Sequence, residues 1–375
     1  MTDLYIGLMS GTSMDGVDGA LVDFSTQKPL VTQVFTAQIA PKLRAELMAL
    51  NTASHNELHR AALAANGLAR SYAQVVHALL ARSGLQASHI KAIGAHGQTV
   101  RHQPQMHDQT GYTWQLNNPA LLVELTGIDV VADFRSRDLA AGGQGAPLAP
   151  FFHRAWFATP HATQAVGVLN LGGISNLSIL LPDGTTLGCD CGPANALLDM
   201  WCQQHTGAAF DEAGAWAASG QVNAQLLAQM LAEPYFALPP PKSTGRDLFN
   251  RAWLDLHLAA FSQEAPQNIQ KTLVELTAST INTCSSSYEN NSKYKLNELI
   301  VCGGGAYNTA LMQRLQTLMP HTAVISSADR GLPPNEVEAT AFAWLARQTV
   351  LRQAIPLSSV TGAQGARVLG CIYPA

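Results

Sequence analysis

The sequence predicts an α/β protein built of two similarly constructed lobes. Its 375 residues exceed what one hydrophobic core usually organises, so two lobes are expected. Each half opens with a β-hairpin whose first turn carries glycine and hydroxyl residues, and helices then alternate with strands. Duplicated α/β lobes commonly leave a cleft between them, where we expect the functional site.

The first half follows this pattern from its first residues. Residues 4–9 form a buried strand, and a turn at Ser10-Gly11-Thr12-Ser13 leads to a second strand over 17–24. Helical spacing over 56–82 ends at Gly84, a typical C-terminal stop. The remaining predicted elements of this half are a strand over 90–95, a helix that starts at Pro119, and a strand over 128–132.

The same order of elements then restarts. A strand over 165–171, a glycine-rich turn, a returning strand over 177–181 and a third strand over 185–190 open the second half. Helices are predicted at 194–204, 222–231, 253–261, 269–284, 306–318 and 337–351, with a strand at 299–301 and a polar exposed loop at 285–295. We place the boundary in the Gly/Ala/Pro-rich stretch 142–150. This gives lobes over 1–141 and 142–375, and leaves open whether the C-terminal segment packs back on the first lobe.

Composition excludes several classes of protein. With 22 basic and 26 acidic residues and no long block of charge, the chain lacks the electrostatic pattern of a nucleic-acid-binding protein. No apolar run approaches the ~18 residues that span a bilayer, and the N-terminus lacks the features of a secretory signal. Six cysteines in so long a chain do not indicate a disulfide framework, so we expect a cytoplasmic protein. We expect Cys189 and Cys191 to point to opposite faces of their strand, which suits neither a disulfide nor a metal site.

Three glycine-containing turns after strands carry the functional prediction. They are Ser10-Gly11-Thr12-Ser13, Gly172-Gly173-Ile174-Ser175-Asn176 and Gly303-Gly304-Gly305-Ala306. Glycine lets backbone N–H groups approach an anion, and hydroxyls add donors to phosphate oxygens. For any one of these turns taken alone, the alternative explanation is a tight turn that uses glycine only because its backbone needs positive φ. Three such turns, two of them at matching places, indicate a divided phosphate site, whereas P-loop, Rossmann and zinc motifs are absent from the sequence.

This arrangement resembles the superfamily of actin, sugar kinases and heat-shock chaperone ATPases. The resemblance implies two ribonuclease-H-like lobes that bind ATP, two turns for the phosphates and a third turn for the adenosine. The ATP-binding residues so implied are Gly11, Thr12, Ser13, Met14, Asp15, Gly16, Val17, Asp18, Gly172, Gly173, Ser175, Asn176, Gly303, Gly304, Gly305 and Asn308. The superfamily often has Asp just before each phosphate turn, where this chain has Met9 and Asn170. The ligands of an expected Mg²⁺ are therefore left open among Asp15, Asp18 and Asp190.

A closer resemblance, over nearly the whole chain, is to the anhydro-N-acetylmuramic acid kinases. Eight ordered motifs carry it: Gly7-Leu-Met-Ser-Gly-Thr-Ser-Met-Asp-Gly-Val-Asp18, Gly94-Ala-His-Gly-Gln-Thr99, Asp133-Phe-Arg-Ser-Arg-Asp138, Gly142-Gly-Gln-Gly-Ala-Pro147, Asn170-Leu-Gly-Gly-Ile-Ser-Asn176, Asp190-Cys-Gly-Pro193, Lys242-Ser-Thr-Gly-Arg246 and Val301-Cys-Gly-Gly-Gly305. The resemblance implies that ATP and water open the 1,6-anhydro bridge of the sugar and yield the 6-phosphate of N-acetylmuramic acid. That reaction belongs to peptidoglycan recycling.

Candidate catalytic and sugar-binding residues follow. A carboxylate at Asp190 can take a proton from the attacking water, and its alternative is a turn-capping aspartate. The resemblance implies that Glu338 positions the sugar or water. The alternative is an ordinary glutamate in the first turn of a helix, stabilised by the helix dipole. Arg135 and Arg137 suit the lactyl carboxylate of a muramic sugar, although a surface ion pair is the alternative for either. Gln98 can bond sugar hydroxyls or simply cap a loop.

Two rival functions differ in class. The first is another sugar or acyl kinase of the same superfamily, which the arginine pair disfavours. The second is a nucleotide-switched binding module of the chaperone kind, for whose separate peptide-binding domain we expect no residues here. The expected partner is a small amino sugar, with neither nucleic acid nor membrane, and a homodimer is left open.

Overall fold

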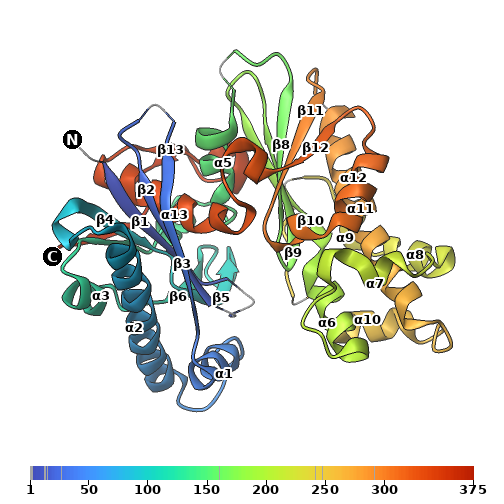
Figure 1. The fold of residues 1–375 in the computed structure, drawn as a ribbon, viewed down its shortest axis with the longest axis horizontal. Helices are drawn as coiled ribbons and strands as arrows, with labels where there is room; N and C mark the ends of the chain where they lie inside the picture. Colours follow the sequence, from blue (N-terminus) through green and yellow to red (C-terminus); the bar gives the residue numbers. More distant parts are fainter. Residues whose placement is uncertain are drawn as a thin grey trace. The chain divides into compact units, whose positions relative to one another are not determined.

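The computed structural model describes residues 3–11, 14, 16–26, 28–159, 161–240, 242–246, 248–290 and 292–375. Strands and helices alternate along the chain, as the sequence predicts (Figure 1). The chain divides into two compact units, residues 1–156 with 336–375 and residues 157–335. Within the described ranges, no helix combines the length and the apolar character needed to cross a membrane.

A six-stranded mixed sheet forms the centre of the first unit. Strands β1 (Leu4–Met9), β2 (Gly16–Asp23) and β3 (Leu30–Gln38) run as an antiparallel meander. Strands β4 (Ile90–Ala95) and β7 (Val130–Ala132) extend the sheet parallel to β1, and β15 (Cys371–Tyr373) pairs antiparallel with β7. The order is therefore β15-β7-β4-β1-β2-β3.

Alternation along the strands gives this sheet two apolar faces. Ile6 and Leu8 of β1 belong to a core with the long helix α2 (Glu57–Ser83) and α3 (Pro119–Thr126). Tyr5 lies on the opposite face, in a core with α5 (Ala149–Phe157) and α13 (Val337–Val350). Because successive side chains of a strand point to opposite sides, one short strand contributes to both cores.

Helix α13 approaches the sheet closely because two glycines leave room for its backbone. A Cβ atom at Gly7 would lie 1.8 Å from the Ala339 carbonyl oxygen, and one at Gly94 would lie 2.0 Å from the Phe342 carbonyl oxygen. Both separations are far shorter than any real contact of this kind, so a side chain at either position would displace the helix. These glycines therefore set the depth of α13.

The second unit repeats the topology of the first. Strands β8 (Ala165–Leu171), β9 (Ile174–Leu180) and β10 (Thr186–Pro193) form the antiparallel meander, and β11 (Leu296–Cys302) and β12 (Ala323–Ser326) continue parallel to β8. Their order β10-β9-β8-β11-β12 matches β3-β2-β1-β4-β7 of the first unit. The predicted duplication is confirmed, and this shared order is that of a ribonuclease-H-like sheet.

Helices α6 (Asn195–Thr206), α11 (Pro266–Asn290) and α12 (Thr309–Leu318) supply much of the core on one face of this sheet (Figure 1). The smaller helices α7 (Ala215–Ala218), α8 (Ala224–Leu231), α9 (Pro234–Ala237) and α10 (Arg251–Leu258) lie in the same unit. The prediction of a polar loop over 285–295 is wrong, because α11 continues to Asn290. Ser285 is buried and Tyr288 packs against the core, so the polar sequence conceals one more helical turn.

Several elements of the first unit were not predicted. They are the strands β3 and β15, the helices α1 (Pro41–Ala49), α4 (Ser136–Ala140), α5 and α14 (Ser358–Thr361), the hairpin of β5 (Gln98–Pro104) and β6 (Gly111–Leu116), and the short pair β13 (Ile355–Pro356) and β14 (Ala366–Arg367). The division of the chain differs from 1–141 and 142–375 because residues 142–156 belong to the first unit, and so do residues 336–375, the C-terminal segment whose packing the sequence leaves open. Phe151 of α5 and Phe342 of α13 pack in its core, which explains the assignment.

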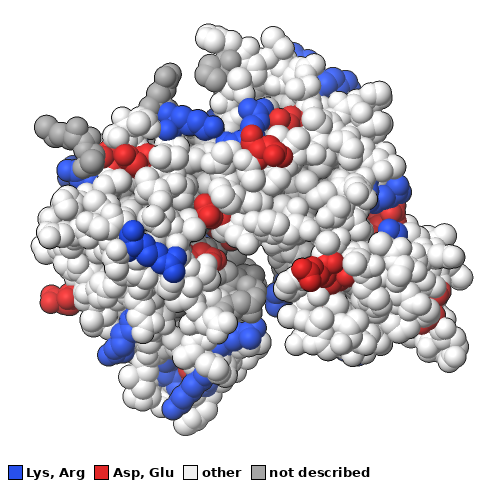
Figure 2. Space-filling view, viewed as in Figure 1, with Lys and Arg blue, Asp and Glu red and all other residues white. Residues whose placement is uncertain are grey.

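Charged side chains are sparse and scattered. They make up 13% of residues, against about 25% in an average soluble domain, and the face seen in Figure 2 carries separate small groups of each sign. This face shows no continuous basic surface of the kind that nucleic acid requires.

Candidate active site

The first glycine turn joins β1 to β2 and is fastened to the turn after β4. Ser10 Oγ lies 3.1 Å from the Tyr72 hydroxyl and donates to the Gly97 carbonyl at 3.3 Å, and Gly97 N–H donates to the same hydroxyl at 3.1 Å. Tyr72, buried in α2, therefore links two turns that lie 87 residues apart in the sequence. Thr12, Ser13 and Asp15 lie outside the described residues.

Other predicted residues of this turn differ in what they can offer a ligand. The side chains of Met14 and Val17 are buried in the α2 core, so only their main chains could contact a nucleotide. Gly11 accepts a backbone hydrogen bond from Met14 N–H at 3.1 Å, and Gly16 begins β2. Burial raises the pKa of the Asp18 carboxyl. The 2.6 Å hydrogen bond that this carboxyl accepts from Thr36 Oγ1 opposes that rise.

Arg135 is held in place by His96. Its Nε and Nη2 lie 3.1 and 2.9 Å from His96 Nε2, and its Nη1 donates to the Gly145 carbonyl at 2.8 Å. Burial, followed by the charge of Arg135, lowers the pKa of His96 well below its ordinary value. The neutral imidazole can therefore accept both hydrogen bonds and fix the guanidinium. Burial lowers the pKa of Arg135 to about 10, so this side chain remains a cation.

Glu338 lies in the first turn of α13, within electrostatic range of Arg135 and Asp18. Although its side chain retains solvent access, desolvation by surrounding protein atoms and then the charge of Asp18 raise its pKa, while Arg135 opposes them. The structure thus brings Asp18, Glu338 and Arg135 together. Arg137 is exposed on α4 and takes no part in this group, so Arg135 is the better candidate of the pair.

Gln98 and Asn117 add unpaired polar atoms to the first unit. Gln98 is fully buried at the start of β5, and its Oε1 has no hydrogen-bond partner in the described structure. Asn117, just beyond β6, has both side-chain polar atoms buried and likewise without a described partner. Buried polar atoms normally find partners, so a polar ligand would complete this pair. Sequence reasoning missed Asn117, which no motif marks.

In the second unit, the second and third glycine turns lie against each other. A Cβ at Gly303 would lie 2.4 Å from Asn170 Oδ1, and one at Gly305 would lie 2.5 Å from Leu171 Cβ. The turn after β11 therefore packs on the end of β8, immediately before Gly172. The N-terminus of α6 closes the same place, where Asn195 N–H donates to the Gly172 carbonyl and its Nδ2 donates to the Leu171 carbonyl.

The glycines of these turns fall into two groups. Gly303 (φ 77°) and Gly305 are required by packing, and Gly303 also by its backbone conformation. At Gly172, Gly173 and Gly304 the nearest atoms to a Cβ are 3.4 Å or more away, and φ lies outside the left-handed region. Packing and conformation thus leave glycine unexplained at these three positions, which supports open space for a ligand.

Two predicted ATP-binding side chains are already engaged. Ser175 is fully buried, and its Oγ donates to the Gly192 carbonyl at 3.0 Å. Asn308 caps α12 by accepting a hydrogen bond from Leu311 N–H at 3.0 Å. For these two residues the structure favours a structural role of the side chain.

Asp190 lies beside the second turn. It pairs with Asn176, which in turn pairs with Asn170, so the three side chains share one face across β10, β9 and β8. The carboxylate accepts a 3.0 Å hydrogen bond from Thr244 N–H. Burial raises the pKa of Asp190 to about 7, and the Thr244 bond opposes that rise.

The Lys242–Arg246 segment holds Asp190 and reaches the second turn. The Lys242 carbonyl accepts from Asp190 N–H at 3.0 Å, and Lys242 Nζ donates to the Tyr235 and Phe236 carbonyls. Lys242 is therefore structural, whereas Arg246 Nη2 would lie 3.4 Å from a Cβ on Gly173. The sequence places Arg246 in a family motif but gives no reason to assign it to the site.

The prediction that Cys189 and Cys191 point to opposite faces is wrong. Residues two apart on a strand share a face, and both thiols lie in the core with Cys284 of α11.

Comparison with known proteins identifies the family that this chain resembles. The family model described as anhydro-N-acetylmuramic acid kinase matches residues 3–375. Anhydro-N-acetylmuramic acid kinases of Variovorax paradoxus and Albidiferax ferrireducens are 60% and 59% identical to this chain. The matches cover all of the chain and 99% and 100% of those proteins. Component A of (R)-2-hydroxyglutaryl-CoA dehydratase from Acidaminococcus fermentans matches with TM-score 0.48 at 10% identity, over 91% of this chain and 96% of that one, too weak a likeness for any conclusion. On the sequence evidence, the chain belongs to the anhydro-N-acetylmuramic acid kinase family.

Proposed function

We propose that this protein is an ATP-dependent kinase that opens the 1,6-anhydro ring of anhydro-N-acetylmuramic acid with water and phosphorylates O6. The products are N-acetylmuramic acid 6-phosphate and ADP, and the reaction serves peptidoglycan recycling in the cytoplasm. The observation that carries the proposal is the family match over residues 3–375. The Asp190 carboxylate, which lies within β10 beside an open glycine turn, supports it independently.

Asp190 acts as the base in this proposal. Water attacks the anomeric carbon, its proton passes to the Asp190 carboxylate, and the bond from that carbon to O6 breaks. The freed O6 attacks the γ-phosphorus, the bond from that phosphorus to the bridging oxygen breaks, and ADP leaves. The raised pKa of Asp190, about 7, suits this role, because a general base works best with a pKa near the working pH.

The first unit supplies groups for the sugar. Arg135 offers two-pronged recognition of the lactyl carboxylate, and His96 holds it in orientation. The unpaired atoms of Gln98 and Asn117 suit sugar hydroxyls or the acetamido group. Glu338, whose pKa is raised, can orient the water or a hydroxyl.

Glycine turns supply the nucleotide site. Open space lies beside Gly172, Gly173 and Gly304, where a side chain would otherwise extend. This space suits the binding of phosphate and adenosine. Arg246 brings a positive charge to the same turn. The first turn contains Gly11 and Gly16, together with Thr12, Ser13 and Asp15, which lie outside the described residues. We assign it to the phosphates by its correspondence in topology with the second turn.

Mg²⁺ is expected to accompany ATP. Such an ion commonly takes one or two protein carboxylates and completes its shell with phosphate oxygens and water. Asp18 or Asp190 can provide that carboxylate, and Asp15 remains a third candidate. The bound ion would neutralise charge on the phosphates.

Product mass tests the proposal. The protein is incubated with ATP, Mg²⁺ and anhydro-N-acetylmuramic acid in H₂¹⁸O, and the product should gain one phosphoryl group and one labelled water. Asp190→Asn, which keeps shape and an acceptor for Thr244, should lower turnover by about 10² to 10⁴. A product that gains phosphoryl without water, or a parental rate in Asp190→Asn, would contradict the assignment.

A matched glycine pair tests the nucleotide site. Gly304→Val should leave the melting temperature unchanged and weaken ATP binding, because its side chain enters open space. Gly303→Val should instead lower the melting temperature, because its side chain meets Asn170 and Leu171. Parental ATP affinity in Gly304→Val would mean that the third turn does not contact nucleotide.

A further inference from the structure

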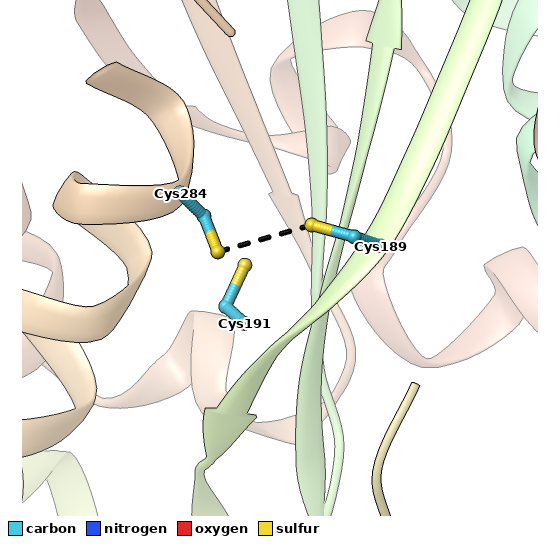
Figure 3. A group of neighbouring side chains, drawn as sticks. All are labelled: Cys189, Cys191 and Cys284. Carbon is cyan, nitrogen blue, oxygen red and sulfur yellow. Dashed lines mark hydrogen bonds between the residues drawn. The ribbon is translucent and has the colours of Figure 1, made fainter. Parts of the chain in front are cut away.

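Three buried thiols meet in the core of the second unit, on the side of β10 away from Asp190. Cys189 and Cys191 of β10 and Cys284 of α11 have sulfur atoms that all lie within 4.8 Å of one another (Figure 3). The Cys189 and Cys284 sulfurs are 3.8 Å apart. All three are free thiols, with exposed fractions of 2%, 1% and 4% respectively.

The fold holds the two elements that carry these thiols in fixed relation. The register of β10 against β9 shifts between Asp190 and Gly192, a bulge that reshapes the strand at Cys191. Helix α11 is fastened just beyond it, where Thr277 Oγ1 donates to the Pro193 carbonyl at 3.1 Å. The sulfur cluster is therefore positioned by main-chain structure on both sides.

We propose that Cys189, Cys191 and Cys284 form a three-sulfur binding site for Cu(I). Thiolate sulfur is the donor that soft d¹⁰ cations prefer. Three sulfurs at about 2.3 Å from a shared ion lie roughly 4.0 Å apart. The cluster is already close to that arrangement, so binding requires only small side-chain adjustments.

The number of donors favours Cu(I) over Zn²⁺. Structural zinc almost always takes four ligands, whereas Cu(I) is satisfied by three sulfurs. Among the His, Cys, Asp and Glu residues that the structure describes, no fourth ligand atom joins this cluster. Apolar side chains of the same core, such as Leu177 and Ile281, surround it, and the Tyr288 side chain lies within hydrogen-bond reach of Cys189.

Binding replaces the thiol protons with the cation and releases those protons to solvent. The resulting site carries excess negative charge in the protein interior. Lys242 lies within electrostatic range of Cys284 and offsets part of that charge, whereas Asp190 opposes it.

Competition with a chelator tests the site. The whole chain, reduced and kept anaerobic, is titrated with Cu(I) against bicinchoninate, and a parallel titration uses Zn²⁺ against a zinc chelator. We expect one equivalent of Cu(I), sulfur-to-metal charge-transfer absorption in the ultraviolet, and X-ray absorption that shows three sulfurs at about 2.3 Å. Zn²⁺ should bind at least tenfold more weakly.

Matched variants identify the ligands. Cys191→Ala and Cys284→Ala should each lose at least a hundredfold in Cu(I) affinity. Cys202→Ala removes a buried thiol from the same core outside the cluster, and Cys371→Ser removes the exposed thiol, so both should bind as the parent does.

Three outcomes would overturn the proposal: no Cu(I) retained against bicinchoninate, equal binding by Cys191→Ala and the parent, or Zn²⁺ held more tightly than Cu(I). If Cys191→Ala fails to fold, the sulfur count of the parental complex decides. Fewer than three sulfurs would show that the cluster is only packed thiols.

Discussion

Replacing Gly94 with Ala should both destabilise the protein and impair catalysis. The new Cβ would lie 2.0 Å from the Phe342 carbonyl oxygen and 2.8 Å from its carbon, and both atoms are backbone, which cannot rotate away. To reach 3.0 Å, below which such contacts are essentially never seen, α13 must retreat by 1.0 Å. Overpacking of this kind costs about 1–3 kcal/mol, and sometimes more.

The displaced helix carries Glu338 in its first turn. A misplacement of about 1 Å at a catalytic constellation can cost on the order of 10² in rate. Urea unfolding should therefore show the loss of stability. Turnover of the anhydro sugar, measured well below the unfolding transition and per folded molecule, should fall by about that factor.

Gly67→Ala is the matched control. Gly67 lies inside α2, and the atoms nearest to its Cβ would be those of the Leu43 side chain, at 3.0 Å, which can adjust. Alanine in a helix interior is favoured over glycine by about 0.5–1 kcal/mol, so this variant should be as stable as the parent or more so. An unchanged free energy of unfolding in Gly94→Ala would refute the close approach of α13. A destabilised variant with parental turnover per folded molecule would refute the link to Glu338.

Three further predictions concern single side chains. Asp138→Ala should cost about 2–5 kcal/mol in urea unfolding, because the buried carboxylate accepts 2.6 Å hydrogen bonds from Gly145 N–H and Thr361 Oγ1; a loss below 1 kcal/mol would contradict it. Arg246→Gln should raise the KM for ATP about tenfold, the size expected from losing one charge-assisted hydrogen bond, with the melting temperature unchanged, and an unchanged KM would exclude phosphate contact. The folded protein keeps His96 neutral, so below pH 6.5 only the unfolded chain gains that proton and stability falls by up to about 1.4 kcal/mol per pH unit. His96→Gln should remove the contribution of His96 to the pH dependence of the free energy of unfolding. An identical pH slope in parent and variant would contradict the claim that His96 stays neutral in the folded protein.

The sequence was enough to predict several buried strands and the repeated order of elements, because that information is local. Strands over 4–9, 90–95 and 165–171 are continuous apolar runs between glycine-rich turns, and the structure has strands at these places. The edge strand β3 escaped notice because four of its nine residues are exposed and it carries several polar side chains. The hairpin of β5 and β6 escaped because its strands also carry several polar side chains.

Membership of a unit could not be predicted from local pattern. Helix α13 was expected as a helix, but its place against β1 and β4 depends on the missing side chains of Gly7 and Gly94. Those glycines look like ordinary strand glycines in the sequence. The contact they permit joins residues more than 240 positions apart, and nothing near Ala343 in the sequence reveals it.

The roles of individual site residues depend equally on distant partners. Gly303 and Gly304 are adjacent glycines with different roles. Asn170 and Leu171 leave no space for a Cβ at Gly303, whereas a Cβ at Gly304 would enter open space. Sequence alone could not separate them. Nor could it choose between Arg135 and Arg137, because the choice rests on His96, 39 residues away.

Strand β10 shows how one short segment serves two kinds of chemistry. Alternation directs Asp190 to the face shared with Asn176, and directs Cys189 into the core with α11. The main chain between them is fixed from outside the sheet, because the Tyr235 hydroxyl donates to the Asp190 carbonyl at 2.8 Å and Asp190 N–H donates to the Lys242 carbonyl. A change in the sulfur cluster must therefore either be absorbed by side-chain rotation or strain these two bonds, which also position the Asp190 carboxylate.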